Sequence, residues 1–149
     1  QIVNLLKRLH DELSLAYPFR APDPAVVKHL CDRIAVMYLG KVVETGTKEE
    51  VYAHATHPYT QSLLSAVPRP DPTLRNTRKR LVLTGDLPSP ASPPSGCRFR
   101  TRCWAAQAVC AQEEPVLADR FEDDHPSACH FASHDFTHAP LPNDAAPDS

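Results

Sequence analysis

Four of the five cysteines in the sequence lie between Gly96 and His130, and they are the side chains with the clearest capacity for chemistry. Few large apolar side chains accompany them, so this stretch cannot bury enough apolar surface to fold on its own. Four thiols can hold such a stretch together by binding a metal ion or an iron–sulfur cluster, or by forming two disulfides. The four are Cys97, Cys103, Cys110 and Cys129.

The spacing of these cysteines, C-x5-C-x6-C-x18-C, bears on which chemistry they support. Structural zinc sites favour closer pairs, with roughly two to four residues between cysteines. An iron–sulfur cluster is larger and accepts ligands from separate loops. The spacing therefore favours a cluster over zinc, while disulfides and unligated thiols stay open as alternatives.

Arginines and histidines accompany the cysteines. Three arginines can offset the negative charge of a thiolate-ligated cluster, or they are solvated surface charges. Two histidines flank the last cysteine, and either can act as a substitute ligand, although a polar surface role is favoured. These residues are Arg98, Arg100, Arg102, His125 and His130.

Other residues with chemical potential have simpler interpretations. Cys31 stands apart from the four and is expected to be a small buried apolar side chain. Histidines spaced by four near the end would align on a helix, but the polar, proline-flanked context argues against one and against a metal site there. His54 and His57 have no nucleophile and aspartate in a recognisable order, so no hydrolase triad is indicated. The spaced histidines are His130, His134 and His138.

Composition excludes several functions. Lys plus Arg number 16 against 18 Asp plus Glu, a balance that argues against nucleic acid or an anionic membrane as main partner. No apolar run is long enough to span a bilayer. The start, residues 1–4, has neither an initiator Met nor a signal-peptide pattern, so we expect a missing upstream part and a reducing compartment that disfavours disulfides.

The elements that must position the cysteines begin with an amphipathic helix over residues 1–13, whose leucine stripe is expected to cover a sheet. Residues 15–20 have the position of a strand, but Pro18 interrupts it. Asp23 and Pro24 then open a short helix that runs to Cys31. Its apolar side chains, Val26, Val27 and Leu30, are expected to face inward.

A hairpin and two helices follow. Strands are predicted over 33–39 and 42–45, with the turn at Gly40–Lys41. Thr47 and Glu50 fit a capping box for a helix to about residue 53. His57-Pro58 starts another helix, to residue 67, whose inward side is Tyr59, Leu63, Leu64 and Val67. This alternation of strand and helix predicts the end of an α/β domain.

Composition changes after residue 67. Prolines and a basic run make residues 68–80 a solvated linker. Residues 81–83 are long enough for one short strand, and 81–131 form a small irregular cysteine-rich extension. Residues 132–149 are polar and proline-containing, and are predicted to be a disordered tail.

Several motifs carry a family resemblance. Residues 32–44 read DRIAVMYLGKVVE, residues 57–68 read HPYTQSLLSAVP, and residues 85–97 contain GDLPSP and PPSGC. Together these resemble the ATP-binding subunits of bacterial oligopeptide and dipeptide ABC importers, over residues 1–131. The resemblance implies that residues 1–67 are the C-terminal half of an ABC-type P-loop nucleotide-binding domain, and that 81–131 are the C-terminal extension peculiar to these subunits.

The resemblance also implies ligands and partners. That extension is associated with a [4Fe–4S] cluster at cysteines in the positions of Cys97, Cys103, Cys110 and Cys129. The implied partners are a second ATPase subunit, membrane-spanning permease subunits and an external peptide-binding protein. The implied location is the cytoplasmic face of the cell membrane, as a peripheral protein without a span of its own.

The resemblance places the phosphate-binding loop, the signature motif and the Mg²⁺-holding strand upstream of Gln1, and the sequence contains no Gly-x-x-x-x-Gly-Lys-Ser/Thr. Pro22 occupies the position of the family's switch histidine, and proline has no side-chain donor for a phosphate. We therefore expect this polypeptide alone neither to bind ATP tightly nor to hydrolyse it, and we assign it no catalytic residue. Two alternatives are a free-standing iron–sulfur or zinc module and a non-functional pseudogene product.

Overall fold

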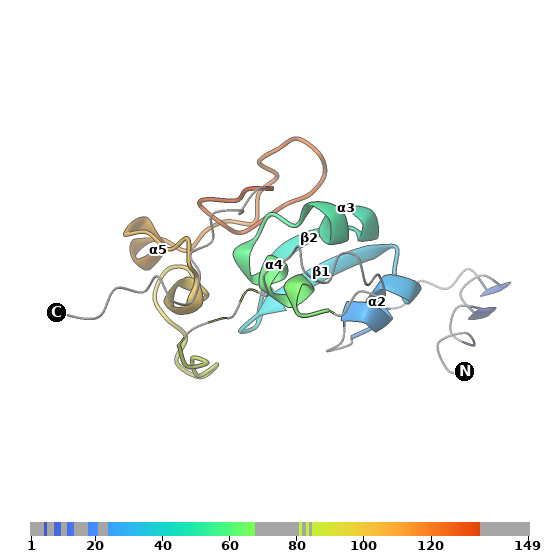
Figure 1. Ribbon diagram of the computed structural model, residues 1–149, viewed down its shortest axis with the longest axis horizontal. Coiled ribbons are helices and arrows are strands. Elements are labelled where there is room, and N and C mark those ends of the chain that lie inside the picture. The colour runs from blue at the N-terminus through green and yellow to red at the C-terminus, as the bar shows by residue number, and fades with distance from the viewer. Residues whose placement is uncertain are drawn as a thin grey trace.

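The computed structural model describes residues 5, 8, 9, 12, 13, 18–20, 24–67, 81, 83 and 85–134, and Figure 1 shows their arrangement. These residues form helices and one two-stranded antiparallel sheet, in agreement with the α/β class that the sequence predicts. Residues 96–130, called here the cysteine-bearing segment, have little regular structure. In chain order the elements are α2 (Pro24–Leu30), β1 (Arg33–Tyr38), β2 (Lys41–Thr47), α3 (Lys48–His54), α4 (Pro58–Ser65), η2 (Arg100–Arg102) and α5 (Val109–Gln112).

The hairpin of β1 and β2 is confirmed, with its turn one residue earlier than predicted. Tyr38 lies opposite Lys41, so the turn residues are Leu39 and Gly40. Both have positive φ, 44° and 80° respectively, as a two-residue turn that matches the twist of the strands requires. A bulge between Val36 and Met37 shifts the register.

The ends of α3 and α4 are set by the caps that the sequence predicts. In α3 the Glu50 N–H donates to the Thr47 hydroxyl at 3.3 Å, and the Thr47 N–H donates to the Glu50 carboxylate at 2.6 Å, which completes the capping box. In α4 the imidazole Nδ1 of His57 accepts the Tyr59 N–H at 3.0 Å, and Pro58 occupies the first turn. Two local sequence signals thus fix the positions of both helices.

The inward face of α4 differs from the prediction. The four apolar residues expected there are only half-buried, whereas the fully buried positions of α4 are mainly polar. The polar side of α4 faces the buried carboxylate of Glu44 on β2, which Thr60 contacts. This polar contact, rather than the apolar pattern, decides which side of α4 is buried. The buried residues are Pro58, Thr60 and Ser62.

The segments before β1 match their predicted secondary structure better than their predicted burial. The five described residues within 1–13 are helical, but the leucines among them do not cover a sheet: Leu5, Leu9 and Leu13 are 54%, 38% and 58% exposed. Residues 18–20 form no strand, as the proline there leads one to expect. Helix α2 matches its prediction, and the apolar residues expected inward are half-buried.

A short segment of the cysteine-bearing residues lies along β2 (Figure 1). The Thr45 N–H donates to the Pro126 carbonyl at 3.0 Å, and the Ala128 N–H donates to the Val43 carbonyl at 2.8 Å. Ser127 bridges Glu44 on one side and Ala118 on the other. Residues 126–128 therefore extend the hairpin on its β2 side.

The apolar core lies where the hairpin meets the cysteine-bearing segment. Tyr38, Val43 and Phe99 are buried together, and the Tyr38 and Phe99 rings are 5.1 Å apart in an edge-to-face arrangement. Cys97 and Cys103 pack against this cluster, as does Leu83. The strand predicted at 81–83 is not formed at Leu81 or Leu83; the Leu81 N–H instead donates to the Ser65 hydroxyl at 3.2 Å.

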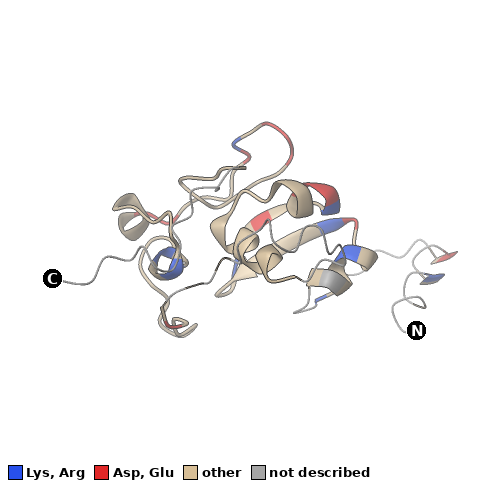
Figure 2. Cartoon of the chain, viewed as in Figure 1, with Lys and Arg blue, Asp and Glu red and all other residues tan. Residues whose placement is uncertain are grey.

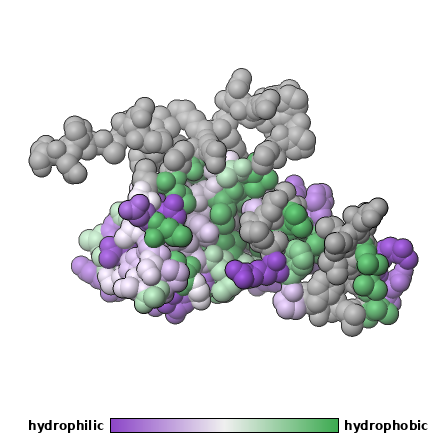
Figure 3. Space-filling view, turned by 90° about the horizontal axis from the view of Figure 1, so that it is seen from below, coloured by the Kyte–Doolittle hydropathy of each residue, from purple (hydrophilic) through white to green (hydrophobic). Residues whose placement is uncertain are grey.

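The described part of the chain carries charges of both signs (Figure 2). Figure 2 shows acidic and basic residues spread over several elements, and Figure 3 shows hydrophobic surface open on the underside of the molecule. Within the described ranges, no helix combines the length and the hydropathy needed to cross a membrane.

Candidate functional site

The four predicted cysteines lie in one region, next to the apolar core. All are free thiols; Cys110 and Cys129 are buried, and Cys97 and Cys103 are half-buried. The Cys97 N–H donates to the Cys110 carbonyl at 2.8 Å, which brings the first and third positions together. Gly96 permits this approach, because its φ is +61° and a Cβ there would lie 2.4 Å from the Cys110 carbonyl oxygen.

The thiols influence one another electrostatically. Burial, with smaller contributions from Cys129, Cys97 and Cys110, raises the pKa of Cys103 to about 12. Burial likewise raises the pKa of Cys129 to about 11, with contributions from Cys97 and Cys110. Both shifts favour the protonated thiol over the thiolate.

Backbone donors lie against three of the sulfurs. N–H groups of Phe99 and Arg100 are directed at Cys97, that of Ala105 at Cys103, and that of Phe131 at Cys129. Such donors favour the thiolate, the form that binds metals, and they oppose the effect of burial. Among the residues that the structure describes, however, no three or more His, Cys, Asp or Glu side chains are grouped as holding a metal ion requires. The predicted ligand set therefore stays a prediction.

The arginines divide into distinct roles. Arg100 acts on the Cys97 thiol, lowering its pKa against the larger effect of burial, and it also bonds Ser95. Arg98 donates to the Leu39 carbonyl and so ties the segment to the hairpin turn. Arg120, which the sequence did not single out, acts on Cys129 as Arg100 acts on Cys97.

A buried carboxylate, Glu44, was not predicted from the sequence. It is fully buried and accepts the Thr56 N–H at 2.6 Å, the Thr56 hydroxyl at 2.9 Å and the His57 N–H at 3.2 Å. Burial alone would raise the pKa of Glu44, but the contacts with His125 and Thr56 hold it below its ordinary range. Glu44 thus joins β2 to the connection between α3 and α4.

His125 completes this network from the cysteine-bearing segment. Its Nε2 lies 2.8 Å from the Glu44 carboxylate, and both side chains are 0% exposed. That contact raises the pKa of His125 and favours its charged form. The polar surface role favoured for His125 is therefore wrong, because the histidine is buried in an ion pair.

Gly46 makes room for this imidazole. A Cβ at Gly46 would lie 3.0 Å from Cδ2 of His125, and Gly46 lies on the same side of β2 as Glu44. A carboxylate followed two positions later by glycine on one strand face was the available signal. It indicates a polar side chain approaching the strand, although it does not identify which one.

His57 joins the same region by both ring nitrogens. Nδ1 caps α4, and the ring also contacts the Ala128 carbonyl. Burial lowers the pKa of His57 to about 4, so the ring is neutral at physiological pH. His57 is thus a structural cap with a second contact to the cysteine-bearing segment.

An acidic loop precedes His125 (Figure 2). The Asp119 carboxylate accepts the N–H of Asp124 at 2.9 Å and that of Phe121 at 3.3 Å. Asp124 also lies 3.1 Å from Arg33 on β1. These contacts hold the loop that places His125 beside Glu44.

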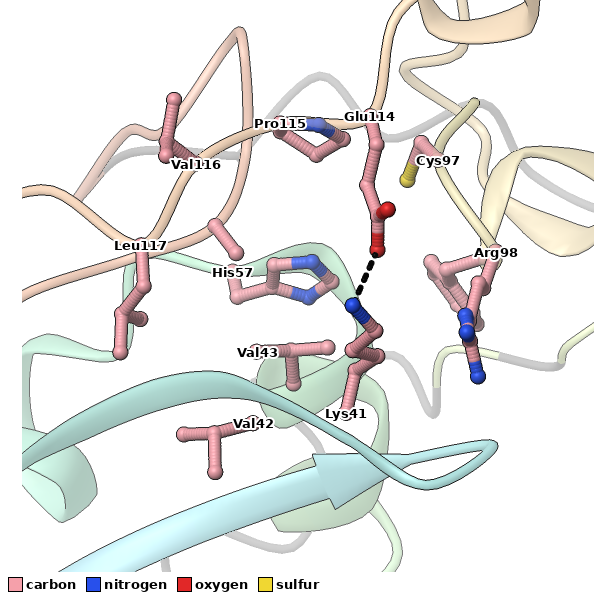
Figure 4. Close-up of a pocket in the computed structure, with 12 residues that line it drawn as sticks. Lys41, Val42, Val43, His57, Cys97, Arg98, Glu114, Pro115, Val116 and Leu117 are labelled. Atoms are coloured by element: carbon pink, nitrogen blue, oxygen red, sulfur yellow. Dashed lines mark ion pairs between the residues drawn. The ribbon is translucent and has the colours of Figure 1, made fainter. Parts of the chain in front are cut away.

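A cavity of about 310 Å³ lies between the hairpin and the cysteine-bearing segment. Figure 4 shows Val42, Val43, Val116 and Leu117 on one side and Lys41, Glu114 and Arg98 on the other. Lys41 and Glu114 form an ion pair of 3.2 Å. Cys97 and His57 also line the cavity.

Pro22 and His138 lie outside the described residues. The other predicted residues make contacts of their own. Cys31 is half-buried rather than buried. His130 contacts the Glu113 carbonyl at 3.1 Å, and His134 contacts the His54 carbonyl at 3.0 Å; neither is helical.

Comparison with known proteins gives consistent matches. The sequence model of a family described as "Oligopeptide/dipeptide transporter, C-terminal region" matches residues 43–110. The oligopeptide transport ATP-binding protein OppF of Salmonella typhimurium is 54% identical over 129 residues, covering 87% of this chain and 38% of the relative. OppF of Escherichia coli is 53% identical with the same coverage.

A dipeptide transporter protein matches as well. The dipeptide transport ATP-binding protein DppF of Haemophilus influenzae is 50% identical over 117 residues, 78% of this chain and 35% of the relative. The chain thus spans less than two fifths of the length of each of these three relatives.

Proposed function

Because the chain belongs to the family of oligopeptide and dipeptide transport ATP-binding proteins, whose C-terminal region it matches, we propose that it serves ATP-driven import of peptides. The observation that carries this proposal is the 54% identity over 129 residues, which includes both the hairpin and the cysteine-bearing segment. Its proposed partners are a second ATP-binding subunit, the permease subunits and an external peptide-binding protein. Its proposed place is the cytoplasmic face of the membrane.

Within this role we divide the chain into residues 1–67, part of the nucleotide-binding domain, a linker at 68–80, the extension at 81–131 and a tail at 132–149. ATP and Mg²⁺ belong to the phosphate-binding motifs of the family, and no residue here is proposed as catalytic. The contribution of this chain is structural. Bonding of residues 126–128 to β2, and of His125 to Glu44, supports a role for the extension in holding the hairpin.

Co-purification tests the proposed import function. A tagged chain expressed in its own host should be recovered from solubilised membranes together with permease subunits, because the resemblance assigns it to that assembly. The measurement is mass spectrometry of the purified complex. A tag on an unrelated soluble protein is the control, and recovery of the chain without any permease subunit would contradict the proposal.

The four cysteines are proposed to hold a [4Fe–4S] cluster, with zinc as the alternative. The donor set supports this: four free thiols lie within electrostatic range, and N–H groups are directed at three of the sulfurs. A four-iron cluster spaces its sulfurs more widely than a single ion does. When bound, it would link the four thiolates and could carry one electron.

Metal loading tests the cluster. The chain isolated without oxygen should carry iron and acid-labile sulfide in equal amounts and absorb visible light. Cys110→Ser should lose most of the iron, whereas Cys31→Ser, which alters a cysteine outside the four, should retain it. Colourless protein loaded with zinc would overturn the cluster assignment.

A further inference from the structure

The geometry points to a binding site for a short zwitterionic peptide with an apolar side chain, in the cavity beside Cys97 (Figure 4). The choice of a peptide over other molecules of this chemistry rests on the proposed function in peptide import. The volume of about 310 Å³ lies at the lower end of the range of small-molecule sites, roughly 300–1,000 Å³. A ligand of about the size of a dipeptide fits this volume.

One side of the cavity offers an apolar surface. Val43 is buried at its base, whereas Val116 is 75% exposed and Leu117 is 41% exposed at its rim. Covering apolar side chains that are open to water is favourable, because it removes apolar surface from water. This side therefore suits a branched or aromatic ligand side chain.

The other side presents charges of both signs. The Lys41 ammonium and the Glu114 carboxylate are 3.2 Å apart, and their side chains are 52% and 51% exposed. An exposed pair of this kind contributes little to stability, so a ligand can separate it easily. A zwitterion would exchange this single weak pair for two contacts, its carboxylate on Lys41 and its ammonium on Glu114.

The remaining titratable groups of the lining favour this orientation. Arg98 adds a second cation beside Lys41, so that the lining holds two cations and one carboxylate. His57 is neutral because burial lowers its pKa to about 4, so it does not oppose a carboxylate.

Calorimetric titration of the full chain with alanyl-leucine tests the site. We expect saturable binding, with affinity reduced about tenfold or more for the C-terminal amide and for the N-acetylated form, because each lacks one charge. Free leucine carries the same charges on a smaller body and should bind more weakly. Equal binding of leucine would overturn the assignment to a peptide, and absence of saturation by alanyl-leucine would overturn the site.

Two variants assign the charges. Lys41→Gln should weaken discrimination against the amide, with Arg98 still present, and Glu114→Gln should abolish discrimination against the acetylated form. The matched controls are Lys48→Gln and Glu49→Gln, which alter a pair of 3.7 Å on α3 and should leave both preferences unchanged. Unaltered discrimination in Lys41→Gln or Glu114→Gln would overturn the proposed orientation, with melting curves confirming that each variant folds.

This outcome is separable from that of the import proposal. A chain that co-purifies with permease subunits but does not bind alanyl-leucine leaves the import function standing and removes this site. A chain that binds the peptide but recovers no permease subunit does the reverse.

Discussion

Replacing Glu44 with alanine is expected to lower the free energy of unfolding by about 3–5 kcal/mol, the range for breaking a buried ion pair by removal of one partner. The carboxylate is fully buried and accepts bonds from Thr56 and His57 besides its contact with His125. Its removal leaves a buried imidazole and backbone N–H groups without their acceptor. Urea unfolding followed by circular dichroism measures the change.

Companion variants separate the charge from the packing. Glu49→Ala removes a carboxylate that is 75% exposed and should change stability by less than about 0.5 kcal/mol. The double variant with His125→Ala should be less destabilised than the sum of the two single variants, since neither charge is then left unpaired. A loss below about 1 kcal/mol in Glu44→Ala, or full additivity in the double variant, would show that the pair does not hold the segment.

Acid is expected to destabilise the fold by about 3 kcal/mol between pH 6.5 and pH 4 through His57 alone, at about 1.4 kcal/mol for each pH unit. Burial lowers the pKa of His57 from its ordinary 6.5 to about 4. Between these values the unfolded chain takes up a proton that the folded chain does not. Stability is therefore fully present above pH 6.5 and is lost as the pH falls toward 4.

The other two members of the network act in different windows. Because the pKa of Glu44 is lowered from 4.5, its contribution is present above that value and is lost as pH falls through the lowered pKa. Because the pKa of His125 is raised from 6.5, its contribution is present below 6.5 and is lost as pH rises through the raised pKa. Stability should therefore decline on both sides of a maximum.

Denaturant titrations at a series of pH values measure this profile. His57→Asn supplies the control, because asparagine can still accept the Tyr59 N–H at the helix cap but cannot take up a proton. It should flatten the decline between pH 6.5 and pH 4 while leaving the alkaline decline in place. The same acid slope in His57→Asn as in the unaltered chain would assign the acid loss to other groups.

Local signals predicted the local structure well. The capping box of Thr47 and Glu50, the proline at the start of α4 and the glycine of the hairpin turn each act within a few residues, so the sequence displays both partners at once. Helix α2 and both strands were also predicted correctly, because their signals are local too. The strand expected at 81–83 fails at its described residues, because strand propensity cannot show whether a partner strand is available.

These local signals could not predict the network of contacts around Glu44. Strand periodicity assigns Glu44 to a face of β2 but does not say what covers that face, and its partner His125 is far along the chain. A histidine near cysteines therefore suggested a ligand or a surface side chain. The four cysteines stay a predicted ligand set: their thiols influence one another electrostatically, but their spacing leaves open whether they hold a cofactor and which one.

The attachment of residues 126–134 to the hairpin and its helices also sets an order of events during synthesis. His134 and the His54 carbonyl that it contacts are 80 residues apart in the chain. At typical rates of translation that interval lasts roughly 4–16 s. For most of it Glu44 stays uncovered, because His125 and Pro126 are added only near its end. A ribosome that stalls in this interval leaves a hairpin in which the Glu44 carboxylate, buried in the complete chain, is still exposed to water.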